Sequence, residues 1–236
     1  MPSIIPELKN RFKAEAEPGY REHVAKLFNL NVDGYFGVRV PKIRAIAQEF
    51  YGNIKNLPID QKLDVCDLLL HENIYELKVT AYQWAGKCKR QFERHHINLF
   101  EAWLLEWTKD WADCDDICSN VLGEYFLKFP DEAQRVLEWT TSDNLWFRRA
   151  AGVSLLKLLR KGSHIELALQ IATELLEDKE DLVQKGYGWM LKEASKKWPD
   201  EVISFLKTHH SSMPRTAYRY ALEKYPREIK SEMMQL

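Results

Sequence analysis

The sequence predicts an all-α fold made of repeated helix pairs, and three observations support this prediction. Apolar residues recur at three- and four-residue spacing along most of the chain, as they do on the buried face of a helix. The 236 residues include only ten glycines, and no stretch combines strict polar–apolar alternation with a hairpin turn. Polar-to-apolar helix starts also recur at a nearly constant interval. These patterns disfavour a β-sheet fold.

The helices can be followed along the chain by their periodicity and by the prolines between them. The clearest periodic segments are Ile97–Trp107, Val153–Leu159 and Ile165–Leu176. A proline followed by a capping residue indicates that one helix ends and the next begins. Two such positions are Phe129-Pro130-Asp131 and Trp198-Pro199-Asp200. Further prolines between predicted helices are Pro58, Pro214 and Pro226.

Four helix starts indicate a weak internal repeat. They are Asn73-Ile-Tyr, Lys109-Asp-Trp, Asn144-Leu-Trp and Asp181-Leu-Val, and successive starts are 36, 35 and 37 residues apart. A period of this length with two helices per unit is typical of HEAT-like arrays, whose units stack into a solenoid with a concave surface. No linker stands out, so we expect one domain over residues 1–236, with a less regular N-terminal third.

Composition and charge limit the function classes. Hydrophobic residues make up 45% of the chain and charged residues 29%, as in an ordinary globular protein. The first ten residues lack the apolar core of a signal peptide and no run approaches a membrane span, so we expect a cytoplasmic protein. The formal net charge is −1, but residues 148–236 hold 16 Lys and Arg against 12 Asp and Glu. Such asymmetry is compatible with a basic face on a neutral protein.

Cysteines and histidines give no signature of a metal site. The four cysteines lie in apolar patterns without CxxC spacing, and we expect reduced core thiols; they are Cys66, Cys88, Cys114 and Cys118. The adjacent histidines, His95-His96 and His209-His210, have no acidic residue nearby at ligand spacing. We therefore expect surface histidines and no metal site.

The second helix of each repeat combines aromatic and charged residues. Trp111 and Asp115 are four residues apart and so share one face of a helix. Trp146-Phe-Arg148-Arg149 follows in the next unit and Gly188-Trp189 in the one after. Most of the eight tryptophans must be core residues, but a buried carboxylate beside one seldom persists without a partner or a task.

Together these residues suggest a cleft that cleaves an N-glycosidic bond. Aromatic faces pack against sugars and bases, and arginine pairs with phosphate. A carboxylate near a sugar can stabilise the positive charge that develops as the glycosidic bond breaks. A structural ion pair between Asp115 and Arg149 would give the same sequence pattern.

Three long segments resemble the AlkD family of alkylpurine DNA glycosylases. They are Lys109–Ile117 continuing through Leu122–Pro130, Ser142–Ala151, and Gln184–Glu193. The resemblance covers nearly the whole chain in order. It implies an all-helical solenoid that removes N3- and N7-alkylated purines from double-stranded DNA, without a metal or organic cofactor and as a monomer.

The resemblance also implies roles for individual residues. Trp111 and Trp189 match two tryptophans that pack against the deoxyribose of the lesion nucleotide. Asp115 matches the carboxylate that stabilises the oxocarbenium-like sugar and orients water. Arg149 matches an arginine of the same cleft, near the DNA backbone. Phe28 stands where the family has a tyrosine near DNA, in a stretch, Leu27–Gly34, that looks less helical.

Some positions resemble divergent, AlkF-like members better than AlkD itself. The residue after Trp111 is Ala112, and the segment Gly37–Arg44 follows the divergent pattern. Some such paralogues are believed to bind branched DNA with little glycosylase activity. The alternatives to a glycosylase are therefore a binder of branched or damaged DNA and a protein-binding HEAT scaffold.

Basic residues near the expected cleft are candidates for contacts with phosphate. The densest basic run holds Lys87, Lys89 and Arg90, and its alternative interpretation is a solvated turn between helices. Arg148, beside Arg149, and Lys185, one turn before Trp189, lie on the helices that carry the expected site residues.

Overall fold

The computed structural model describes residues 4–28 and 31–236. Within these ranges all secondary-structure elements are helices, and none is a strand. This confirms the all-α prediction. Contacts between residues divide the chain into two compact units, residues 1–121 and 122–236. The two units are described separately below. No helix in the described ranges is both long enough and apolar enough to cross a membrane.

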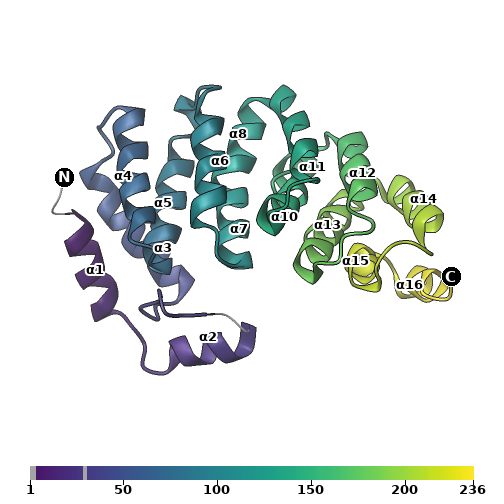
Figure 1. Cartoon of the computed structure of the whole chain (residues 1–236), viewed down its shortest axis with the longest axis horizontal. Helices are drawn as coiled ribbons and strands as arrows, with labels where there is room; N and C mark the ends of the chain where they lie inside the picture. The colour runs from purple at the N-terminus through teal and green to yellow at the C-terminus, as the bar shows by residue number, and fades with distance from the viewer. Residues whose placement is uncertain (1–3, 29–30) are drawn as a thin grey trace. The chain divides into compact units, whose positions relative to one another are not determined.

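The described residues of the first unit form helices α1 to α7, which are labelled in Figure 1. They are α1 (Ile4–Ala14), α2 (Tyr20–Phe28), α3 (Val40–Phe50), α4 (Ile59–His71), α5 (Tyr75–Lys87), α6 (His96–Trp107) and α7 (Trp111–Ile117). The core contains large side chains from several of these helices, among them Phe12, Trp84 and Trp103. The indole N–H of Trp84 donates to the carbonyl oxygen of Ala47 at 2.7 Å, so burial leaves this polar group satisfied.

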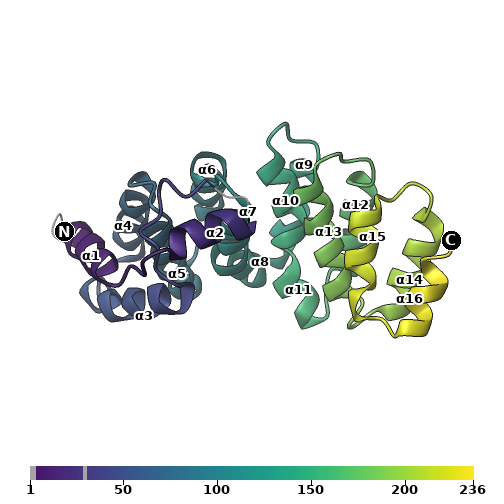
Figure 2. The same cartoon turned by 90° about the horizontal axis from the view of Figure 1, so that it is seen from below.

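The second unit holds helices α8 to α16. They are α8 (Gly123–Lys128), α9 (Val136–Trp139), α10 (Leu145–Val153), α11 (Leu156–Lys161), α12 (Ile165–Glu174), α13 (Asp181–Ala194), α14 (Pro199–His209), α15 (Arg215–Ala221) and α16 (Arg227–Met233). Figure 2 shows α10, α13 and α15 side by side, and these helices contact one another in that order.

Close packing in this row depends on a glycine. A Cβ atom added to Gly188 of α13 would lie 2.8 Å from the carbonyl oxygen of Ala217 and 2.8 Å from the Cβ atom of Tyr220, both on α15. Only glycine therefore lets the two helices approach this closely.

The four predicted helix starts are confirmed. Helices α5, α7, α10 and α13 begin at Tyr75, Trp111, Leu145 and Asp181. Asp110 and Asn144 are side-chain N-caps of α7 and α10, as expected of polar residues at such positions. The five prolines expected between helices also lie at helix starts: Pro58, Pro130, Pro199, Pro214 and Pro226.

Two sequence expectations need correction. The segment Val153–Leu159 is not one helix, because α10 ends at Val153 and α11 starts at Leu156 after a turn. The stretch Leu27–Gly34 is helical at its start, since Phe28 is the last residue of α2. Residues 29 and 30 of that stretch lie outside the described part of the chain. Expected core thiols are confirmed: all four cysteines are buried and lie outside any disulfide.

Candidate functional site

Helix α7 carries two of the predicted site residues. Asp110 caps the helix, because its Oδ1 atom accepts hydrogen bonds from the backbone N–H groups of Ala112 and Asp113 at 2.8 and 3.0 Å. Trp111 is the first residue of the helix, and Asp115 follows one turn later. Both side chains are partly exposed. The cap thus presents an indole and a carboxylate on one accessible face of α7.

A third predicted residue joins them from far away in the sequence. The ring of Phe28, at the end of α2, meets the ring of Trp111 edge-on with centroids 5.5 Å apart and planes at 64°. Phe28 is still 47% exposed. Within the first unit, the structure therefore brings Phe28 next to Trp111, with Asp115 one turn along α7.

The opposite face of α7 carries a buried ion pair that sequence reasoning missed. Asp113 is 2% exposed, and its Oδ2 atom accepts hydrogen bonds from the Lys78 ammonium at 2.8 Å and the Lys109 backbone N–H at 3.1 Å. Lys78 also donates to the carbonyl oxygen of Trp107 at 2.9 Å. Burial raises the pKa of Asp113 to about 6, although Lys78 favours the ionised carboxylate. The pair ties α5 to α7.

A second inward carboxylate ties α7 to α3. Asp116 accepts hydrogen bonds from the Arg44 guanidinium at 3.3 Å and the Asn120 side-chain amide at 2.7 Å. Burial raises the pKa of Asp116 to about 7, against the opposing effect of Arg44. Asp113 and Asp116 therefore hold the helix, and the partly exposed Asp115 lies on a different face of it.

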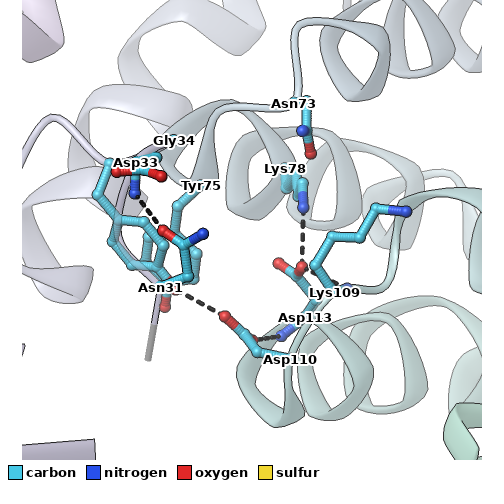
Figure 3. Close-up of a pocket in the computed structure, with 10 residues that line it drawn as sticks. Asn31, Asp33, Gly34, Asn73, Tyr75, Lys78, Lys109, Asp110 and Asp113 are labelled. Carbon is cyan, nitrogen blue, oxygen red and sulfur yellow. Dashed lines mark hydrogen bonds and ion pairs between the residues drawn. The ribbon is translucent and has the colours of Figure 1, made fainter. Parts of the chain in front are cut away.

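A small polar pocket lies beside the start of α7 (Figure 3). Its volume is about 170 Å³, and its lining is rich in carboxylates, amides and lysines: Asn31, Asp33, Gly34, Tyr35, Asn73, Tyr75, Lys78, Lys109, Asp110 and Asp113. The rings of Tyr35 and Tyr75 stack with centroids 4.3 Å apart and planes at 7°. The Tyr35 hydroxyl donates to Asp110 Oδ2 at 2.9 Å.

In the second unit, α10 and α13 carry Arg149 and Trp189. Arg149 is 5% exposed, and its guanidinium donates to the carbonyl oxygen of Leu182 on α13. Gly186 provides the room, since a Cβ atom there would lie 3.1 Å from the Arg149 side chain. Trp189 is partly exposed one turn after Lys185.

The basic residues predicted to bind DNA have partners inside the protein. Arg148 forms an ion pair with Asp178 at 2.6 Å and donates to the carbonyl oxygens of Ser142 and Asp143 at 2.7 and 3.0 Å. Lys185 pairs with Asp181 at 2.6 Å across one helical turn. Phosphate contacts by these residues stay predictions.

The basic run at the end of α5 is exposed. Lys87 donates to the Gln48 side chain and lies 5.1 Å from the centre of the Tyr51 ring. Lys89 and Arg90 lie in a short 3₁₀ turn, Lys89–Gln91. Their contact with phosphate also stays a prediction.

One histidine departs from the expected surface position. His96 is 3% exposed, and its Nε2 atom lies 3.4 Å from Asp60 Oδ1 on the preceding helix pair. The expectation that no acidic residue is nearby was wrong because Asp60 is distant in sequence. Asp60, His95 and His96 present ligand atoms within 4.8 Å of one another. However, His96 Nδ1 accepts a hydrogen bond from the Glu93 backbone N–H at 2.8 Å, so the ring proton of neutral His96 lies on Nε2, facing the carboxylate rather than a metal.

The sequence matches one known protein family over most of its length. The family described as "DNA alkylation repair enzyme" matches residues 8–225. The chain belongs to this family. No curated protein matches the chain.

Solved structures share the fold of this DNA alkylation repair family member. A predicted DNA alkylation repair enzyme from Enterococcus faecalis superposes with a TM-score of 0.80 at 17% identity, over 90% of this chain and 98% of that one. AlkD2 from Streptococcus mutans gives a TM-score of 0.62 at 20% identity, over 88% and 98%. The smu.31 protein from Streptococcus mutans UA159 gives 0.61 at 20% identity, over 87% and 98%.

The family resemblance led to Trp111 and Asp115 but not to the residues that hold their helix. The missed residues are Tyr35, Lys78, Asp113 and Asp116. A lysine within the apolar run Leu77–Ala81 was the available signal, since a charge on a buried helix face requires a partner. The partner is on the next repeat, and its distance in sequence concealed it.

Proposed function

We propose that this protein is a monofunctional DNA glycosylase that hydrolyses the N-glycosidic bond of N3- and N7-alkylated purines in double-stranded DNA. The observation that supports this most is the α7 turn, where the partly exposed Trp111 and Asp115 share one face and Phe28 packs edge-on against the indole. Membership of a DNA alkylation repair family gives that turn its chemical context.

The proposed reaction begins from a substrate that is already activated. An alkyl group at N3 or N7 makes the purine cationic, so the base leaves with the bonding electron pair as a neutral group. Positive charge then develops on the deoxyribose. The Asp115 carboxylate stabilises that charge and orients a water molecule, which adds to the anomeric carbon and loses a proton.

The aromatic and basic residues would bind the DNA around that bond. In this proposal the rings of Trp111 and Trp189 pack against the sugar, and Arg149 lies near the DNA backbone. Phe28, Arg148, Lys185, Lys87, Lys89 and Arg90 provide further DNA contacts. We further propose that the protein acts as a cytoplasmic monomer and a single HEAT-like domain, without metal or cofactor.

The test is release of 7-methylguanine from a methylated duplex by wild-type protein and by Asp115→Asn. We expect the substitution to slow release by about 100-fold or more, with the dissociation constant for duplex changed less than about threefold. Asp116→Asn is the matched control, because it removes the charge of the adjacent carboxylate but keeps an oxygen that can accept the hydrogen bonds from Arg44 and Asn120. Its release rate should stay near that of the wild type.

Two outcomes would lead to other conclusions. Equal release by wild type and Asp115→Asn would remove the catalytic role of Asp115. No release by the wild type, with tighter binding to a branched junction than to linear duplex, would indicate a binder of DNA structure.

A further inference from the structure

The loop before α3 connects three parts of the first unit that carry or support the proposed site. It follows α2, which ends at Phe28, it packs on the start of α5, and it reaches the N-cap of α7. The residues that make these contacts are Gly34–Val38. None of them belongs to the site predicted from the sequence.

The loop is held firmly on α5. The buried carboxylate of Glu76 accepts hydrogen bonds from three consecutive backbone N–H groups, those of Phe36, Gly37 and Val38, at 2.9 to 3.1 Å. The carbonyl oxygen of Gly34 accepts the Tyr75 N–H at 2.8 Å. A carboxylate that accepts several N–H groups makes strong, charge-assisted hydrogen bonds, so the backbone of this loop has little freedom.

Gly34 allows the loop to lie close to the backbone of Asn73. A Cβ atom at this position would be 2.6 Å from the carbonyl oxygen of Asn73. The glycine therefore lets the loop backbone lie directly against the residues that precede α5.

Tyr35 extends from this anchored loop to α7. Its ring stacks on that of Tyr75 at 4.3 Å, and its hydroxyl donates to Asp110 Oδ2 at 2.9 Å. Burial and the nearby Asp110 carboxylate raise the pKa of Tyr35, so the hydroxyl stays a donor. The other oxygen of Asp110 holds the first N–H groups of α7, and the same helical turn begins with Trp111.

We propose that Tyr35 is a positioning residue, which holds the Asp110 cap and thereby sets where Trp111 and Asp115 lie relative to the substrate. This inference rests on the proposed glycosylase function. The Lys78–Asp113 pair secures the buried face of α7 (Figure 3), and Tyr35 secures the end that begins with Trp111. A displacement of about 1 Å at a reacting group can cost on the order of 100-fold in rate.

The experiment compares Tyr35→Phe with Tyr75→Phe. Both substitutions keep the stacked ring pair, but only the first removes the hydroxyl that donates to Asp110. With protein in excess over methylated duplex, we expect Tyr35→Phe to lower the rate constant of 7-methylguanine release about tenfold. Its duplex dissociation constant and melting temperature should stay near the wild-type values, and Tyr75→Phe should match the wild type throughout.

Amide hydrogen exchange over residues 109–117 provides a readout that needs no catalysis. We expect exchange at Ala112 and Asp113 to be at least about threefold faster in Tyr35→Phe than in wild type or Tyr75→Phe. Unchanged release and unchanged exchange would overturn the inference, and so would faster exchange with wild-type release. If the wild type released no base, the proposed function would fail, and unchanged exchange would then separately overturn the role of Tyr35 at the cap.

Discussion

Three aspartates on one short helix have different environments although their chemistry is the same. Asp113 faces α5 and is neutralised by Lys78, and Asp116 faces α3 and is contacted by Arg44. Asp115, between them in the sequence, is partly exposed and lies on a different face of the helix. Because i and i+3 positions share a face whereas i+2 does not, the helix period alone separates one carboxylate from the other two. The environment of each group then sets its proton affinity.

Asp116 should make stability depend on pH near neutrality. Its pKa is raised from 3.8 to about 7 in the folded protein, so the folded state binds a proton more tightly than the unfolded chain. Protonation therefore stabilises the fold as pH falls, and this contribution is lost as pH rises through about 7. Between pH 8 and pH 6 we expect a gain of about 1 kcal/mol in the free energy of unfolding that Asp116→Asn lacks.

Urea unfolding of both proteins at the two pH values measures this difference. Asp113 also titrates in this range, with a pKa of about 6, but it is present in both proteins. An identical pH dependence in wild type and Asp116→Asn would show that Asp116 ionises at its ordinary pKa.

At the scale of the helix, the N-cap residues both stabilise a helix start and position the site residues that follow it. Asp110 accepts two backbone N–H groups and Asn144 accepts one, each at the start of a helix that carries predicted site residues. A cap satisfies N–H groups that have no partner within the helix. It also determines the residue at which the helix begins, and so the direction in which Trp111 or Arg149 projects.

We expect Asn144→Ala to lower the free energy of unfolding by about 1 kcal/mol. The substitution removes the side-chain oxygen that accepts the Trp146 N–H at 2.8 Å. Chemical denaturation of the full chain measures this loss. Asn144→Asp is the matched control and should stay near wild type, because aspartate is an equally good N-cap. Equal losses in both variants would mean that the cap is not what stabilises this helix start.

For the whole molecule, charge distribution matters more than net charge. The chain carries 34 basic and 35 acidic residues, yet the proposed partner is a polyanion. Ion pairs such as Arg148–Asp178 and Lys185–Asp181 already use some of the basic groups. Binding to DNA must therefore come from a subset of lysines and arginines.

Affinity for duplex DNA should fall as salt concentration rises. If about five basic residues neutralise phosphates, the slope of log affinity against log salt is about −4. Fluorescence anisotropy with a labelled duplex, from 50 to about 200 mM salt, measures this slope. Binding that did not respond to salt, or no binding at all, would favour a protein-binding scaffold over a DNA-binding protein.

Much of the fold could be predicted from the sequence, but part of the site could not. Helix starts at Tyr75, Trp111, Leu145 and Asp181 follow from local capping and periodicity. The burial of His96 and its position beside Asp60 could not be predicted in this way, because the carboxylate belongs to another helix pair. Phe28 was matched by resemblance, and only folding placed its ring against Trp111.

The sequence by itself determined the helical class, the period of the repeat and the face that Trp111 and Asp115 share. These are local properties, governed by contacts within about one helical turn. Only the tertiary structure decided which carboxylates of α7 are buried, that Lys78 lies opposite Asp113, and that Tyr35 reaches the Asp110 cap. The partners in each case are 35 to 75 residues apart, and pairing at that separation depends on how whole helices and loops pack.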